Sequence, residues 1–100
     1  MSASLPEALS ESLQRPEIDT QVFEDDGTFP NNADLPVVVL RRVVRRGGAD
    51  LASTFERLFR ARGWKGQWRN GIFSYHHYHS TAHEVLGVVA GAARVQLGGP

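Results

Sequence analysis

The apolar positions of this chain follow a helical period in one segment and a strand-like pattern in several others. Directly after Asp50, apolar side chains recur every three to four residues along one stripe: Leu51, Phe55, Leu58 and Phe59. Asp50 is suited to cap the N-terminus of a helix, and Gly63 is suited to end one. The pattern therefore predicts one amphipathic helix near residues 51–62.

Runs of β-branched and aromatic residues predict strands elsewhere. Pro36 opens the run from Val37 to Val44. Further runs follow the helix and are separated by short turn segments: Ile72 to His79, Glu84 to Ala90, and Ala92 to Leu97. Consecutive runs of this kind are typical of an antiparallel meander. We therefore predict a mainly β chain.

The N-terminal residues differ from the rest in being polar and punctuated by proline. Leucines recur there at a four-residue spacing: Leu5, Leu9 and Leu13. That spacing predicts a short helix from Glu7 to Gln14, which Pro16 would end. We interpret residues 1–21 as an N-terminal arm and residues 22–100 as one folded domain.

Composition narrows the class of protein. The 100 residues are 41% hydrophobic and 22% charged, which is typical of a single globular domain. There are no cysteines, so disulfides and zinc–thiolate sites are excluded, and any metal must be bound through imidazole and carboxylate. Residues 1–13 lack the basic and apolar regions of a signal peptide, and no run of about 18 apolar residues occurs. We expect a cytoplasmic protein with no membrane partner.

The formal net charge of zero conceals an asymmetry. Residues 1–34 hold eight acidic residues and one arginine, whereas residues 35–100 hold ten basic and three acidic residues. Four arginines are concentrated around the predicted strand: Arg41, Arg42, Arg45 and Arg46. Only this stretch is basic, and no aromatic residues are interleaved with it. Ion pairs or solvated strand ends explain it better than nucleic-acid binding, so we expect no nucleic-acid partner.

All four histidines lie within eight residues of one another: His76, His77, His79 and His83. Side chains two positions apart on a strand share a face, so His77 and His79 can reach one point. A tight antiparallel pairing would bring Glu84 across from them. Two imidazoles and one carboxylate suit one divalent transition metal, Fe, Mn, Zn or Ni, and leave positions open for water, substrate or dioxygen. His77, His79 and Glu84 are therefore the predicted metal ligands.

Two other interpretations of the histidines stay open. His83 is a substitute third ligand, but strand alternation places it opposite Glu84 and makes it the weaker candidate. The whole cluster is also compatible with a polar strand face that binds no metal. Arg69 and Asn70, just before the cluster, are candidates for orienting an anionic substrate, although ion pairing and turn formation explain them equally well.

The segment from Gly71 to Gly91 fits the pattern G-x5-H-x-H-x4-E-x6-G at every fixed position. It resembles the first metal-binding motif of the cupin superfamily. Phe29 to Asn32, the predicted helix and Trp68 to Gly71 further resemble features of small bacterial cupins of mostly unassigned function. The resemblance covers roughly residues 22–100 and implies an incomplete cupin-type β-barrel, or jelly roll.

The resemblance also implies a function: a metal-dependent enzyme, of oxygenase or isomerase type, acting on a small polar molecule. The alternatives are a non-catalytic cupin that binds a sugar or small acid, and an inactive truncated fragment. Cupins have a second motif, resembling G-x5-P-x-G-x2-H-x3-N, which the chain does not contain before Pro100. We expect either a longer parent protein, which a Gly-Gly-Pro terminus favours, or completion of the sheet by a second copy. Exposed strand edges predict a homodimer.

Overall fold

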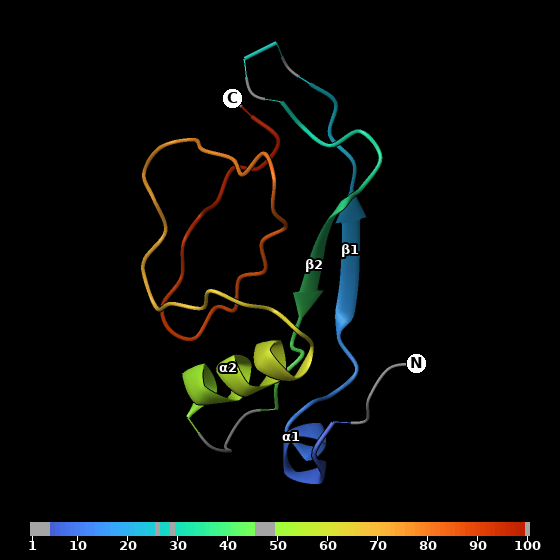
Figure 1. The fold of residues 1–100 in the computed structure, drawn as a ribbon, viewed down its shortest axis with the longest axis vertical. Helices are drawn as coiled ribbons and strands as arrows, with labels where there is room; N and C mark the ends of the chain where they lie inside the picture. Colours follow the sequence, from blue (N-terminus) through green and yellow to red (C-terminus); the bar gives the residue numbers. More distant parts are fainter. Residues whose placement is uncertain (1–4, 26, 29, 46–49, 100) are drawn as a thin grey trace. The chain divides into compact units, whose positions relative to one another are not determined.

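The structure, a computed structural model, describes residues 5–25, 27, 28, 30–45 and 50–99. Within these residues the order of elements is α1 (Glu7–Glu11), β1 (Glu17–Gln21), β2 (Val37–Arg41) and α2 (Leu51–Ala61) (Figure 1). Strands β1 and β2 pair antiparallel in a two-stranded sheet. Neither helix in the described part of the chain is long and apolar enough to cross a membrane.

The chain divides into two compact units. The first unit comprises Met1–Glu17 and Leu40–Arg69, and the second comprises Ile18–Val39 and Asn70–Pro100. Both units combine segments that are far apart in the sequence. The predicted division into an arm at residues 1–21 and a domain at residues 22–100 stays a prediction.

Helix α2 confirms the predicted helix. The Asp50 carboxylate accepts hydrogen bonds from the backbone N–H of Ser53 at 3.2 Å and from its hydroxyl at 2.7 Å, which satisfies one of the free backbone donors of the first turn. Gly63 adopts a left-handed φ of 84° and donates its N–H to the carbonyl of Arg60. Glycine takes this conformation without strain, so the helix ends there.

The core of the first unit lies where α1 packs on α2. Leu9 is its most deeply buried side chain, at 1% exposed, and Ala52 and Thr54 of α2 are buried with it. The Thr54 hydroxyl donates to the carbonyl of Asp50, so this buried polar group is satisfied. Burial of Leu9 between these two helices is the main apolar contribution to the stability of this unit among the described residues.

Helix α1 is shorter than predicted, ending at Glu11 instead of Gln14. Leu13 forms an antiparallel bridge with Val44, and the backbone N–H of Gln14 donates to the carbonyl of Val43 at 2.9 Å. The backbone groups of residues 13 and 14 therefore pair with residues 43 and 44 instead of continuing the helix. Tertiary pairing ends the helix before Pro16 does.

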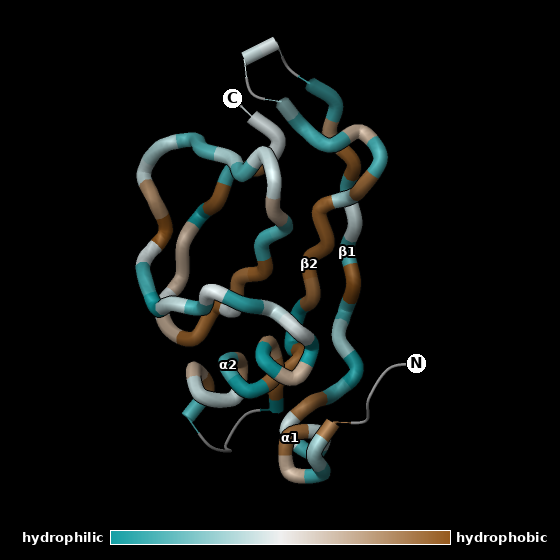
Figure 2. The backbone as a smooth tube through the Cα atoms, viewed as in Figure 1, coloured by the Kyte–Doolittle hydropathy of each residue, from teal (hydrophilic) through white to brown (hydrophobic). Residues whose placement is uncertain are grey.

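Strand β2 confirms the start of the predicted strand at Val37 but not its length. It ends at Arg41, because Arg42 has a φ of 60°, a left-handed conformation that an extended strand does not tolerate. Its partner, β1, was not predicted. Figure 2 shows β2 as a mainly hydrophobic stretch, whereas β1 alternates polar residues with Ile18 and Thr20, a weak strand signal.

The three strands predicted from Ile72 to Leu97 are not formed in the described residues 70–99, which run without paired strands (Figure 1). The observed architecture is one small sheet with two helices, and a jelly roll is not confirmed. β-branched side chains favour an extended backbone, but a strand also needs a partner in register that covers one of its faces. Many apolar side chains of this segment remain exposed, among them Leu86, Val88 and Val95.

Two of the arginines near β2 contact the N-terminal segment. The Arg42 guanidinium forms an ion pair with Glu17, and Nε of Arg45 donates to the carbonyl of Leu13 at 3.0 Å. Arg46 lies outside the described residues. So does Phe29, the first residue of the segment from Phe29 to Asn32 that resembles small cupins. Arg42 and Arg45 thus hold the N-terminal segment beside residues 42–45 of the first unit, as the ion-pair interpretation expects.

Candidate metal centre

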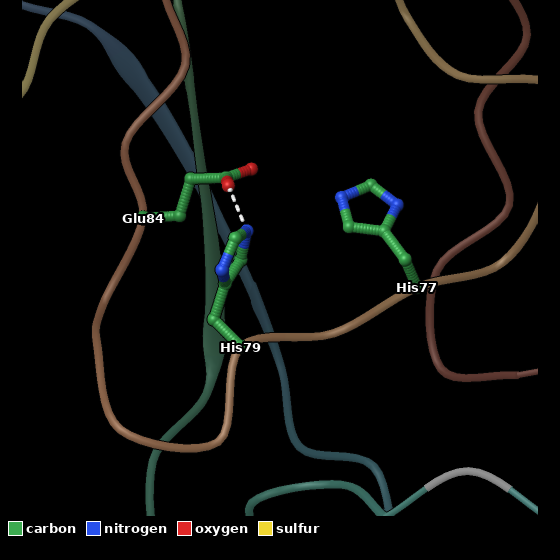
Figure 3. Close-up of side chains that lie close together, drawn as sticks. All are labelled: His77, His79 and Glu84. Carbon is green, nitrogen blue, oxygen red and sulfur yellow. Dashed lines mark ion pairs between the residues drawn. The ribbon is translucent and has the colours of Figure 1, made fainter.

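The three predicted metal ligands come together in the second unit. His77, His79 and Glu84 each offer one ligand atom, and these atoms all lie within 4.8 Å of one another. Figure 3 shows the carboxylate of Glu84 directed at the ring of His79, with the ring of His77 across from both. All three side chains are exposed, so the group is open to solvent and to a ligand.

The tightest contact in this group joins His79 and Glu84. Nε2 of His79 lies 2.8 Å from Oε2 of Glu84. The chain bends at Ser80 and Thr81, which returns Glu84 toward the histidines without a regular hairpin. A turn of only four intervening residues therefore places the carboxylate beside the second imidazole.

The side chains preceding Glu84 form a row of rings at every second residue. Phe73 stacks on Tyr75 with ring centroids 5.2 Å apart, and the rings of Phe73 and His77 form a T-shaped pair with centroids 5.0 Å apart. The rings of His77 and His79 then meet edge to face at 5.6 Å. The alternation predicted for a strand is thus present at these residues, although no strand is paired there.

The spacing of the ligand atoms fits a single metal ion after small side-chain adjustments. Imidazole nitrogens and carboxylate oxygens lie at about 2.0–2.2 Å from a bound transition metal, so neighbouring ligand atoms on one ion are roughly 3–3.5 Å apart. The His79–Glu84 separation of 2.8 Å is already close to this range. The three ligand atoms lie within 4.8 Å of one another, so the group would have to tighten around a bound ion. Two nitrogens and one carboxylate oxygen are also the donor set that Fe, Mn, Zn and Ni accept.

The other sequence candidates have separate environments. His83 is not part of the triad and instead lines a cavity of the second unit with Phe23, Asn31 and Asn32. Sequence reasoning did not identify that cavity, because its lining residues are up to 60 positions apart. The sequence carried no clear signal for it, since adjacent asparagines next to a proline are typical of a turn.

Arg69 and Asn70 are explained by local contacts. Nε of Arg69 donates to the carboxylate of Glu56, and its guanidinium lies 3.8 Å from Asp50. The Glu56 carboxylate raises the pKa of Arg69 further above its usual value, with Asp50 adding to the effect. Asn70 accepts a hydrogen bond from the backbone N–H of Gly71 at 2.8 Å. Ion pairing therefore describes Arg69, and a hydrogen bond to the next residue describes Asn70, while turn formation at Asn70 stays a prediction.

Comparison with known proteins gives one informative relative. The chain is 42% identical over 83 residues to the Bacillus subtilis (strain 168) protein YjlB, which is described as an uncharacterized protein. The aligned region covers 83% of this chain and 47% of YjlB, so the chain spans about half the length of that relative. No family model matches the chain, and no solved structure matches it.

Proposed function

We propose that this chain binds one divalent transition metal ion through His77, His79 and Glu84. The observation that carries the proposal is the convergence of three ligand atoms within 4.8 Å. The two imidazoles would be neutral donors, and the Glu84 carboxylate would offset part of the charge of the ion. The exposure of all three side chains leaves the remaining coordination positions accessible.

We further propose that the metal site belongs to a cupin-type protein. The spacing of the two histidines, the glutamate and the glycines from Gly71 to Gly91 supports this assignment. Such a protein would be cytoplasmic and would act on a small polar molecule, with the metal supplying Lewis acidity or oxygen activation when bound. An oxygenase and an isomerase are both compatible with this donor set.

The exposed apolar residues of the second unit support the barrel part of this proposal. Val85, Leu86, Val88, Val89 and Val95 are all exposed, and a cupin-type sheet would bury such residues against further strands. YjlB is about twice as long as the aligned region, so the rest of a similar protein is one source of those strands. A homodimer that pairs exposed edges is the other source.

Metal titration of the purified chain tests the proposal. Calorimetry with Zn²⁺, Ni²⁺, Mn²⁺ and, without oxygen, Fe²⁺ should show one ion bound per chain. His77→Ala and His79→Ala should each weaken binding at least about 100-fold, because each removes a ligand outright. His76→Ala is the matched control, since it deletes a neighbouring imidazole outside the triad. Binding that survives both triad substitutions would reject the proposed site.

A further inference from the structure

The second unit contains a cavity that none of the three proposed metal ligands lines. Its volume is about 170 Å³, and its wall is formed by Phe23, by residues of the segment from Asn31 to Val37, and by His83. Drug-sized ligands occupy sites of about 300 Å³ or more, so only a small molecule fits this cavity.

Contacts between distant segments hold the wall in place. The Asn31 amide donates to the carbonyl of Glu24 at 2.8 Å and to the carbonyl of Gly98 at 3.0 Å. The Phe23 ring lies directly against Gly98, where an added Cβ would fall 2.3 Å from the ring. Gly98 also has a φ of 90°, which favours glycine. These contacts fix the part of the wall at Phe23 and Asn31, while the cavity is open to solvent on its other side.

Two exposed polar side chains of the wall, Asn32 and His83, keep hydrogen-bonding groups that the described residues do not use. The side-chain oxygen of Asn32 accepts from the backbone N–H groups of Asp34 and Leu35, each at 2.9 Å. This leaves the NH₂ group of Asn32 as a donor with no partner in the described part of the chain. The His83 imidazole likewise has no hydrogen bond or ion pair with the described residues, and in its neutral form it offers one donor and one acceptor.

The remaining wall is apolar and free of fixed charge. Leu35, Pro36 and Val37 contribute apolar side chains to the wall, and Phe23 adds an aromatic ring. Among the described residues that line the cavity, there is no lysine, arginine or carboxylate. A ligand for such a wall needs hydroxyl groups, which both donate and accept, and a C–H face that packs on an aromatic ring.

We propose that this cavity binds one small neutral hydroxylated molecule, of monosaccharide size or smaller, through the Asn32 amide, the His83 imidazole and the Phe23 ring. The site is separate from the metal centre and does not rest on it. His83 and Glu84 are adjacent in the chain, yet one lines this cavity and the other belongs to the His79 contact.

The test is an NMR titration of the full ¹⁵N-labelled chain. A chelator is present throughout, so that metal binding does not contribute to the observed shifts. The probes are D-ribose and D-glucose, with sodium acetate as the anionic comparison. We expect at least one sugar to shift the Asn32 side-chain amide and the His83 ring signals with a dissociation constant on the order of millimolar, and acetate to shift neither.

Two variants assign the binding to these groups. Asn32→Asp keeps the oxygen that accepts from Asp34 and Leu35 but removes the NH₂ donor. His83→Phe keeps a ring of similar size without its nitrogens. Each should weaken sugar binding about 3- to 10-fold, as expected for one lost hydrogen bond. His76→Phe, a histidine substitution outside the lining, should leave the affinity unchanged.

Several results would overturn the proposal. One is the absence of sugar-induced shifts at both residues. Another is acetate binding more tightly than either sugar, because this would assign an anion site. Equal affinity in wild type and in both variants would place the sugar elsewhere. If either variant fails to fold, as judged by loss of dispersion in its amide spectrum, the other variant decides the outcome.

Discussion

Nε2 of His79 lies 2.8 Å from Oε2 of Glu84, although the two residues share no paired strand in the described part of the chain. Their side chains are 52% and 44% exposed, so solvent screens the interaction. Exposed pairs of this kind contribute about 0–1 kcal/mol to the free energy of unfolding. The contact matters chiefly because it positions a carboxylate beside an imidazole.

Glu84→Gln should separate the contribution of Glu84 to metal binding from its contribution to stability. The amide keeps the size of the side chain but loses the charge that holds a cation, so metal affinity should fall about 10- to 100-fold or more. The free energy of unfolding should change by less than about 1 kcal/mol. Metal calorimetry and urea denaturation measure the two quantities. A large loss of stability with unchanged metal affinity would show that the residue is structural.

The ring of Phe73 should influence the metal site through His77. The two rings meet edge to face at 5.0 Å, which restricts the orientation of the imidazole. Aromatic contacts of this kind contribute about 0.5–1.5 kcal/mol, so Phe73→Leu should weaken metal binding about 2- to 10-fold. Tyr78→Leu is the control, because Tyr78 is absent from this row of rings. The same loss in both variants would argue against a specific role for Phe73.

Helix α2 should lose stability in acid because of Asp50. Hydrogen bonds from the Ser53 hydroxyl and backbone N–H lower the pKa of Asp50 from its usual 3.8. The charged form is therefore favoured in the folded state, so this stabilisation is complete above about pH 4 and is lost as the pH falls through the lowered folded pKa. Far-UV circular dichroism and thermal denaturation across this range measure the effect.

Asp50→Asn is the matched variant for that prediction. Its amide oxygen still accepts from Ser53, so the helix keeps a cap, but the group no longer titrates. The acid-dependent part of the stability loss should be smaller in this variant than in wild type. Asp50→Ala removes the cap as well and should lower the thermal midpoint at every pH. Identical acid profiles for wild type and Asp50→Asn would assign the titration to other carboxylates.

Leu9 should be important for the stability of the first unit. Its side chain is 1% exposed at the contact between α1 and α2. Leu9→Ala removes buried methyl groups and leaves a cavity, so the free energy of unfolding should fall by about 2–3 kcal/mol. Urea denaturation measures the change. Ser10→Ala, at the exposed neighbouring position, should change it by less than about 0.5 kcal/mol, and equal effects would place Leu9 outside the core.

Local features of the sequence determined several elements of this protein. Helix α2 was predicted because its cap, apolar stripe and terminal glycine all act within a few residues. The start of β2 at Val37 follows from Pro36 and a β-branched run. The common face of His77 and His79 follows from a two-residue period, and their ring contact agrees with it.

The tertiary structure decided what depends on distant partners. Strand β1 forms by pairing with β2 despite its polar sequence, and α1 ends early because Leu13 bridges Val44. The segment from Ile72 to Leu97 has strand-like residues but no partner strand among the described residues. The cavity lined by Phe23 and His83 likewise forms only because segments up to 60 residues apart in the sequence meet. Caps and periodicity are short-range and can be read along the chain, whereas pairing, burial and cavities depend on which segments meet.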